Sequence, residues 1–180
     1  MQDRTERLFR EMIRFYGGDP ARIQHFIKVH SFAMRIAAGE NLPAAARETL
    51  EPATIVHDIG IKPSEELYGD SAGEHQEQLG PPLARRMLTD LGYDKAVVER
   101  VCTLVGRHHT YKGIDGLDCQ ILIEADFLVN LFENSTGQPA ARAAMDSIFR
   151  TETGRALCAD MFALDPVQAK DNAAEPLGPA

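Results

Sequence analysis

The stretch EPATIVHDIGIKPSEE, residues 51–66, decides how the chain is interpreted. It starts as an apolar run with helical spacing and then places an imidazole beside a carboxylate, at His57 and Asp58. His57 lies seven residues after Leu50, so both fall on the inward side of one predicted helix. Two adjacent side chains at a helix end can converge on one ion, because beyond them the backbone no longer separates them. A hydrogen-bonded pair that only supports the core is the alternative.

Helical periodicity dominates the remainder of the chain, and no alternating strand pattern appears. The fold class that this predicts is all-α. Asp19 is the predicted N-cap of one helix, with Pro20 at its first position. The glycine-bearing polar segment 60–80 predicts a long loop, of the kind that is functional or disordered. The predicted helices cover residues 3–16, 20–39, 43–57, 81–93, 96–109, 119–134, 138–150 and 153–163.

The length and composition are typical of one domain. The chain has 180 residues, of which 44% are hydrophobic, enough for a sizeable core. We expect a single helical domain over residues 1–164, with its core at about 19–133 and two C-terminal helices within 138–163. Residues 165–180 are rich in Ala, Pro and Gly and predict a flexible tail.

Charge and cysteine content exclude several classes of partner. The net charge of −8 argues against a nucleic-acid polymer or an anionic membrane, since both reward a basic surface. A small anionic substrate stays compatible, because a local cation reverses the sign within a pocket. The three cysteines form no CxxC pair, which indicates a reducing compartment. No segment resembles a signal peptide or a membrane span, so we expect a cytoplasmic protein.

Two later helices also carry polar residues on apolar faces. His108 and His109 each continue a stripe of apolar residues along their helix. Asp126 lies between Leu122 and Val129 in the most apolar helix of the chain. A lone carboxylate buried there is costly unless it is paired or binds a cation. Each of these residues has a purely structural interpretation by itself, but three successive helices with the same feature favour a shared site.

The collected imidazoles and carboxylates suit a transition metal or a two-metal centre. Imidazole favours Fe, Zn, Mn or Ni over Ca. A histidine of the helix 20–39 would complete the set, and that helix offers both His25 and His30. Periodicity alone favours His30, which lies at the centre of the apolar stripe. The choice between the two stays open on this reasoning.

The order of these residues resembles the HD superfamily of metal-dependent phosphohydrolases. The resemblance covers about residues 19–133 and is carried by HFIKVHSFA, ATIVHDIGIK, VGRHHT and LIEADFLVNL. In the first of these, valine follows the histidine by four residues and alanine by eight, a pattern that selects His25 over His30. The matching residues, in chain order, are His25, His57, Asp58, His108, His109 and Asp126.

The resemblance implies a helical bundle around a central divalent ion, which would be Fe, Mn, Ni, Co, Zn or Mg. The ligands of that ion would be His25, His57, Asp58 and Asp126. Many members support a second ion with histidines of the middle segment, and His108 and His109 match two such positions. The family often has a further histidine shortly before Gly80. Here His75 is displaced from that position by several residues, so a second ion is left open.

The resemblance also implies hydrolysis of a small phosphorylated substrate, such as a nucleotide, by a metal-activated water. Asp58 would orient the water as well as bind metal. Lys62, directly after the HD turn, is the first candidate for a cation at the scissile group. Arg107, Lys112 and His75 are further candidates for substrate binding. Each of them also has the simpler interpretation of a solvated surface residue.

Other functions fit the same residues. A di-iron enzyme that uses O₂, and a regulatory module that binds metal or ligand without turnover, are the alternatives. A cyclic-dinucleotide phosphodiesterase is disfavoured, because HHTYKGIDG stands where that class has GYP after the two histidines. Met161 and Phe162 either cover the bundle or join two copies in a homo-oligomer, and we expect them to cover the bundle.

Overall fold

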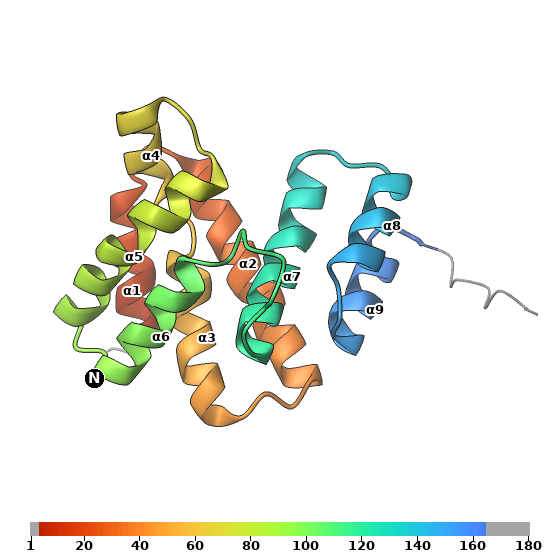
Figure 1. Ribbon diagram of the computed structural model, residues 1–180, viewed down its shortest axis with the longest axis horizontal. Helices are drawn as coiled ribbons and strands as arrows, with labels where there is room; N and C mark the ends of the chain where they lie inside the picture. The colour runs from red at the N-terminus through yellow and green to blue at the C-terminus, as the bar shows by residue number, and fades with distance from the viewer. Residues whose placement is uncertain (1–3, 165–180) are drawn as a thin grey trace, which may run out of the picture.

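The computed structural model describes residues 4–164, and within this range the fold is all-α as predicted. The secondary structure of these residues consists of nine helices (Figure 1). Their bounds are α1 Arg4–Phe15, α2 Pro20–Gly39, α3 Ala44–Val56, α4 Ile61–Tyr68, α5 Gly73–Asp90, α6 Lys95–Val105, α7 Leu117–Glu133, α8 Gln138–Ser147 and α9 Glu152–Met161. The predicted tail 165–180 lies outside the described residues.

Helices α2, α3 and α7 form the middle of the bundle (Figure 1). α3 packs against α1, α2, α6 and α7, while α5 packs against α6 and α4. Helices α8 and α9 pair with each other at the opposite end from α5, where α9 contacts α2 and α7. This arrangement brings the ends of α3 and α6 to the inner faces of α2 and α7, which is where the candidate site lies.

The start of α2 follows from local sequence. The Asp19 carboxylate accepts a hydrogen bond from the Arg22 backbone N–H at 3.1 Å, and Pro20 occupies the first helical position. This satisfies one of the donors that every helix N-terminus leaves unpaired. Asp94 also stands at an N-cap, that of α6, but no hydrogen bond from its side chain to the helix is present.

The prediction of a long loop at 60–80 is wrong. This segment forms α4 and the first half of α5, and Pro81 and Pro82 lie inside α5 instead of at its start. Its glycines allow close packing: a β-carbon at Gly60 would lie 2.5 Å from the Gln76 carbonyl oxygen. A β-carbon at Gly73 would lie 2.7 Å from the His109 ring. Because glycine has no side chain, α5 packs closely against the turn after Asp58 and against the turn that carries His109. In the sequence the same glycines suggest flexibility.

A buried carboxylate attaches the C-terminal pair of helices to the bundle. Glu124 of α7 is fully buried and accepts hydrogen bonds from the backbone N–H groups of Arg150 and Thr151, at 2.6 and 2.9 Å. The Gln120 amide and the Thr151 hydroxyl also donate to it. With all its partners in place, Glu124 is a structural residue that positions the turn between α8 and α9.

The two large apolar residues at the end of α9 differ in burial. Phe162 packs against the hydrophobic core, whereas Met161 is 39% exposed.

The three cysteines are buried free thiols. Burial raises the pKa of Cys102, Cys119 and Cys158 above its usual value. Among the helices described for residues 4–164, none is both long enough and apolar enough to span a lipid bilayer.

Candidate metal centre

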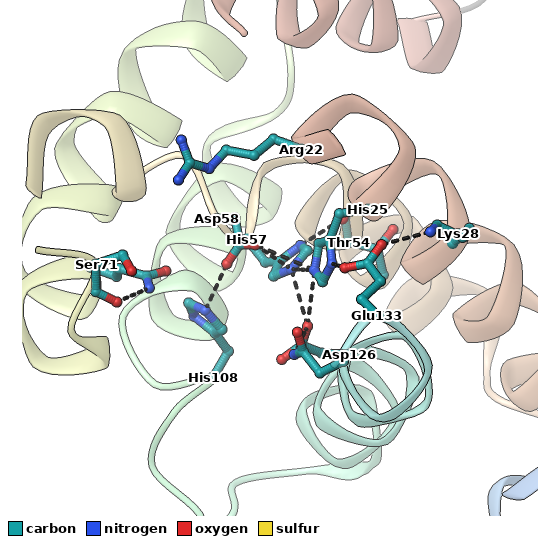
Figure 2. Close-up of polar contacts among 12 residues, drawn as sticks. Arg22, His25, Lys28, Thr54, His57, Asp58, Ser71, His108, Asp126 and Glu133 are labelled. Carbon is teal, nitrogen blue, oxygen red and sulfur yellow. Dashed lines mark hydrogen bonds and ion pairs between the residues drawn. The ribbon is translucent and has the colours of Figure 1, made fainter. Parts of the chain in front are cut away.

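Four side chains from three parts of the bundle meet at one point (Figure 2). The His25 Nε2 atom of α2 lies 3.3 Å from His57 Nε2, 3.3 Å from Asp58 Oδ2 and 3.1 Å from Asp126 Oδ1. His57 Nε2 lies 3.4 Å from Asp58 Oδ2 and 3.6 Å from Asp126 Oδ1. Two imidazole nitrogens and two carboxylate oxygens therefore face one another within 3.1–3.6 Å.

These distances fit ligands of a single cation. At metal–ligand distances of about 2.0–2.2 Å, neighbouring ligands of one ion lie roughly 3.0–3.5 Å apart. Donor atoms of His25, His57 and Asp58 fall within 4.8 Å of one another, and Asp126 approaches this group through the two histidines. Mixed imidazole and carboxylate donors suit Zn, Fe, Mn, Co or Ni. The residues present thus fit a divalent metal.

The same backbone hydrogen bond orients two of the histidines, His57 and His108. His57 and His108 each stand at the C-terminal end of a helix, and each Nδ1–H donates to the carbonyl three residues earlier. The acceptors are the Thr54 carbonyl at 2.9 Å and the Val105 carbonyl at 2.8 Å. Because Nδ1 is engaged by this carbonyl, Nε2 is the nitrogen that points away from the helix end, and it offers a lone pair when the ring is neutral. Both rings are fully buried, so their orientation is fixed by packing as well.

His25 is aimed by a carboxylate. Its Nδ1 lies 2.8 Å from Glu133 Oε2, and the other oxygen of Glu133 accepts from Lys28 Nζ at 2.6 Å. Figure 2 shows this chain of contacts running from Lys28 through Glu133 to His25. A carboxylate behind a histidine fixes the ring's tautomer and raises the basicity of the opposite nitrogen. That nitrogen is Nε2, the one that faces Asp126 and His57.

Hydrogen bonds also hold the two aspartates of the cluster in place. Asn130 Nδ2 donates to Asp126 Oδ1 at 2.8 Å, one turn along α7. The Tyr16 hydroxyl, at the end of α1, donates to the Asp58 backbone carbonyl at 2.6 Å. Burial and the nearby charge of Asp58 raise the pKa of Tyr16 above its usual value, so the hydroxyl stays a donor. The turn that carries Asp58 is therefore attached directly to α1.

Asp58 links this cluster to a second one. Its Oδ1 atom lies 3.4 Å from His108 Nε2, while its Oδ2 atom faces His25 and His57. Donor atoms of Asp58, His108 and His109 lie within 4.8 Å of one another. The Nε2 atoms of His108 and His109 are buried without a hydrogen-bond partner. Glu77 of α5 holds this segment by accepting from the His109 backbone N–H at 3.0 Å.

The cluster buries charged groups of both signs together. Burial alone would favour neutral groups, yet the charge of His57 and the hydrogen bonds around it hold the pKa of Asp58 well below its usual range. Hydrogen bonds from His25 and His57 likewise lower the pKa of Asp126 against the effect of burial. Conversely, the two carboxylates raise the pKa values of His25 and His57 despite their burial. Burial and the neighbouring His108 lower the pKa of His109 to about 4.

The structure places the other candidate residues around this centre. The Lys62 ammonium donates to the Phe15 carbonyl at 3.3 Å and lies over the Phe15 ring. Arg107 and Lys112 are exposed, and Arg107 contacts the Gly113 carbonyl at 3.4 Å. These positions put all three cations on the surface, where their role in substrate binding stays a prediction.

Two histidines lie apart from the cluster. His75 hydrogen-bonds Asp70 at 2.8 Å and stacks on the Tyr68 ring with 3.9 Å between ring centroids. His30 contacts the edge of the Phe9 ring and lies 3.5 Å from Glu51. His30, which periodicity favoured, thus packs between α1 and α3, and His25 is the histidine of α2 that meets His57.

The sequence reasoning missed several residues that support the site. Asn130 and Glu133 follow Asp126 by four and seven residues, so helical spacing alone places them on its face. Arg22 precedes His25 by one turn and pairs with Glu65 at 2.7 Å. Glu77 lies in the segment 60–80, whose glycines and proline predict a loop. The helix that carries it continues through Pro81 and Pro82, which helical propensity does not favour.

The comparisons with known proteins agree with this geometry. The family model described as HD domain matches residues 22–133. Among solved structures, the chain is similar to a crystal structure of a predicted HD superfamily hydrolase from an uncultured Thermotogales bacterium, with 28% identity and a TM-score of 0.60. That match covers 88% of this chain and 83% of the other. A search of curated proteins gives no match. Since the family model spans more than half of the chain and includes all four converging residues, the protein belongs to the HD domain family.

Proposed function

We propose that the protein is a metal-dependent phosphohydrolase that acts on a nucleotide or another small phosphorylated metabolite. The observation that carries this proposal is the convergence of His25, His57, Asp58 and Asp126 at distances that suit one cation. Membership of the HD domain family supports it, and so does the similar structure, whose title names a predicted hydrolase. Whether the enzyme cleaves phosphomonoesters or phosphodiesters is left to the substrate screen below.

In this proposal the four converging residues hold the ion, and His108 and His109 supply donors for a second one. A bound divalent cation lowers the pKa of a coordinated water and offsets negative charge on a phosphoryl group. Asp58 has one oxygen toward each cluster, and its proposed role is to orient the attacking water as well as to bind metal. Glu133 keeps His25 in the tautomer whose Nε2 can bind metal.

Positive side chains near Asp58 are the proposed contacts for the substrate phosphate. Lys62 and Arg22 both line a groove of about 480 Å³, which Tyr16 also borders. The Tyr16 hydroxyl contacts the Asp58 carbonyl, so this groove adjoins the HD turn. Arg22 is paired with Asp19 and Glu65, and a phosphate would have to compete with these carboxylates. Arg107, Lys112 and His75 stay as further proposed contacts on the side of the second cluster.

Metal analysis tests the first step of the proposal. The protein purified without chelator should contain at least one equivalent of divalent metal. The His57→Ala variant should lose it while its helical circular dichroism persists, because a ligand is removed from the end of a helix and not from its interior. His30→Ala is the matched control, since this histidine lies on the same bundle but outside the cluster, and it should keep the metal. Full metal content in His57→Ala would contradict the proposed metal site.

A substrate screen tests the second step. Wild-type protein loaded with Mn, Co, Ni, Zn, Fe or Mg should hydrolyse at least one nucleotide or small phosphoester, and His57→Ala should not. Released inorganic phosphate identifies a phosphomonoesterase, whereas an alcohol and a phosphomonoester as products identify a phosphodiesterase. Consumption of O₂ together with substrate by the iron-loaded protein would instead favour the di-iron alternative. Bound metal without hydrolysis of any phosphoester would favour the regulatory binding module.

A further inference from the structure

The edge of the metal centre carries a tyrosine that has no assigned role. Tyr111 stands two residues after His109, in the connection between α6 and α7. Its hydroxyl lies 3.4 Å from His109 Nδ1, and the His109 and His108 rings lie against each other with 4.0 Å between their centroids. His108 Nε2 in turn lies 3.4 Å from Asp58 Oδ1. The Tyr111 hydroxyl is therefore separated by two imidazole rings from the turn that carries Asp58.

Two contacts hold Tyr111 in this place. Its ring packs edge to face on the Phe127 ring with 5.2 Å between centroids, and Phe127 directly follows Asp126 on α7. The residue before it, Thr110, donates its hydroxyl to Glu77 of α5 at 3.0 Å. Tyr111 is thus attached both to the helix that supplies Asp126 and to the helix that packs against His109.

Tyr111 is open to solvent although it contacts the cluster. Its exposed fraction is 42%, so a ligand that arrives from solvent can reach it. Burial and the carboxylates of Asp126, Glu77 and Asp58 raise the pKa of Tyr111 to about 12. A tyrosine with its usual pKa already keeps its proton at neutral pH, so the hydroxyl is a hydrogen-bond donor irrespective of this shift.

A phosphate bound beside Asp58 needs hydrogen-bond donors, because the carboxylates of the cluster repel its oxygens. Lys62 and Arg107 already donate to backbone carbonyls, at 3.3 and 3.4 Å. The contact from the Tyr111 hydroxyl to His109 Nδ1 is longer than a typical hydrogen bond. The hydroxyl can therefore turn its proton toward a better acceptor, and hydrogen bonds to charged oxygens are the stronger ones.

We propose that Tyr111 is a substrate-contact residue, whose hydroxyl donates a hydrogen bond to an oxygen of the phosphoryl group at the metal centre. This inference rests on the proposed function, because it concerns the substrate of the same site. Phe127 holds the ring and His109 lies beside the hydroxyl, so the donor is in place before substrate arrives. The phosphoryl group is the part that all phosphorylated substrates share. Tyr111 should therefore contribute to the binding of inorganic phosphate as well.

Tyr111→Phe tests this proposal, because it removes the hydroxyl and keeps the ring that packs on Phe127. The probe is inorganic phosphate, whose binding to the metal-loaded protein is measured by isothermal titration calorimetry. Phosphate should bind about 10–100-fold more weakly to Tyr111→Phe than to wild type, since a hydrogen bond to a charged group is lost. The kcat/KM for the substrate found in the screen should fall by at least the same factor. Tyr93→Phe is the matched control: its ring lies under Arg4 of α1, and it should bind phosphate like wild type.

Two further measurements separate contact with the substrate from a purely structural role. The metal content and the melting temperature of Tyr111→Phe should equal those of wild type, since the metal ligands and the ring packing are kept. A residue that only positioned His109 would lower one of these two quantities and leave phosphate binding unchanged at full metal loading.

Three results would overturn the inference. They are equal phosphate affinity of Tyr111→Phe and wild type, a loss of metal from Tyr111→Phe in proportion to its loss of activity, and no phosphate binding by metal-loaded wild type. Hydrolysis of a phosphoester by wild type would leave the proposed function standing in each case. Conversely, weaker phosphate binding by Tyr111→Phe without any hydrolysis by wild type would contradict the proposed function and leave the phosphate contact standing.

Discussion

His25 shows how one residue at the centre depends on a residue outside it. Its Nε2 faces the cluster, while its Nδ1 is engaged by Glu133, which Lys28 holds from the other side. The ring therefore has one orientation, with its Nδ1 proton held by Glu133, before any ion binds. A free imidazole would have to select both its orientation and the nitrogen that keeps the proton when the metal binds, and this selection would weaken affinity.

At the residue scale, Glu133→Ala should weaken binding of the first metal ion by about 10–100-fold, the range typical of residues behind a metal ligand. Competition with a chromophoric chelator measures this affinity directly. Glu48→Ala is the control, since Glu48 is an exposed carboxylate of the bundle, and it should leave the affinity unchanged. An unchanged affinity in Glu133→Ala would show that packing alone orients His25.

At the scale of elements, the site depends on the close packing of α5 against the turn after Asp58 and the turn that carries His109. Gly60 follows the HD turn and touches the backbone of Gln76, and Gly80 lies against Val105 of α6. This contact is what brings the start of α5 to His109. The sequence pattern of glycines and prolines suggested a loop because both residues are poor helix formers in solution. Tertiary packing overrides that preference here, since only glycine leaves room for the neighbouring backbone.

Gly60→Ala should lower the free energy of unfolding by about 1–3 kcal/mol, because the new methyl group overlaps the Gln76 backbone and the helix must shift. Urea denaturation followed by circular dichroism measures this change. Gly137→Ala is the control: the nearest atom to its β-carbon would be 3.8 Å away, and its backbone is compatible with alanine. Equal stability of Gly60→Ala and wild type would mean that α5 is not held against the HD turn in solution.

At the scale of the whole molecule, the buried charges should make the stability of the metal-free protein depend on pH. Carboxylate partners raise the pKa values of His25 and His57 above their usual 6.5. This contribution is fully present below pH 6.5 and is lost as the pH rises through the raised values. The pKa of Asp126 is lowered from 3.8, so its contribution is present above pH 3.8 and is lost in stronger acid.

We therefore expect the metal-free protein, in the presence of a chelator, to melt at progressively lower temperature as the pH rises from about 6.5 to 9. Added Mn²⁺ should reduce this loss, because the ion replaces the imidazolium charge and its affinity grows as histidines deprotonate. Thermal melts at a series of pH values, with and without Mn²⁺, measure both effects. A melting temperature that rises over this range without metal would contradict the expectation.

The sequence by itself determined the all-α fold, most of the helices and the presence of polar residues on their buried faces, because these features are local and follow from helical spacing. Periodicity favoured His30, and the resemblance of HFIKVHSFA to the family pattern selected His25 instead. The physical reason lies only in the tertiary structure: α1 and α3 cover His30 with Phe9 and Glu51, whereas the end of α3 brings His57 to His25. The tertiary structure also decided the role of Glu133. Its partner His25 is distant in the chain, and a contact of this kind depends on how the helices pack against one another.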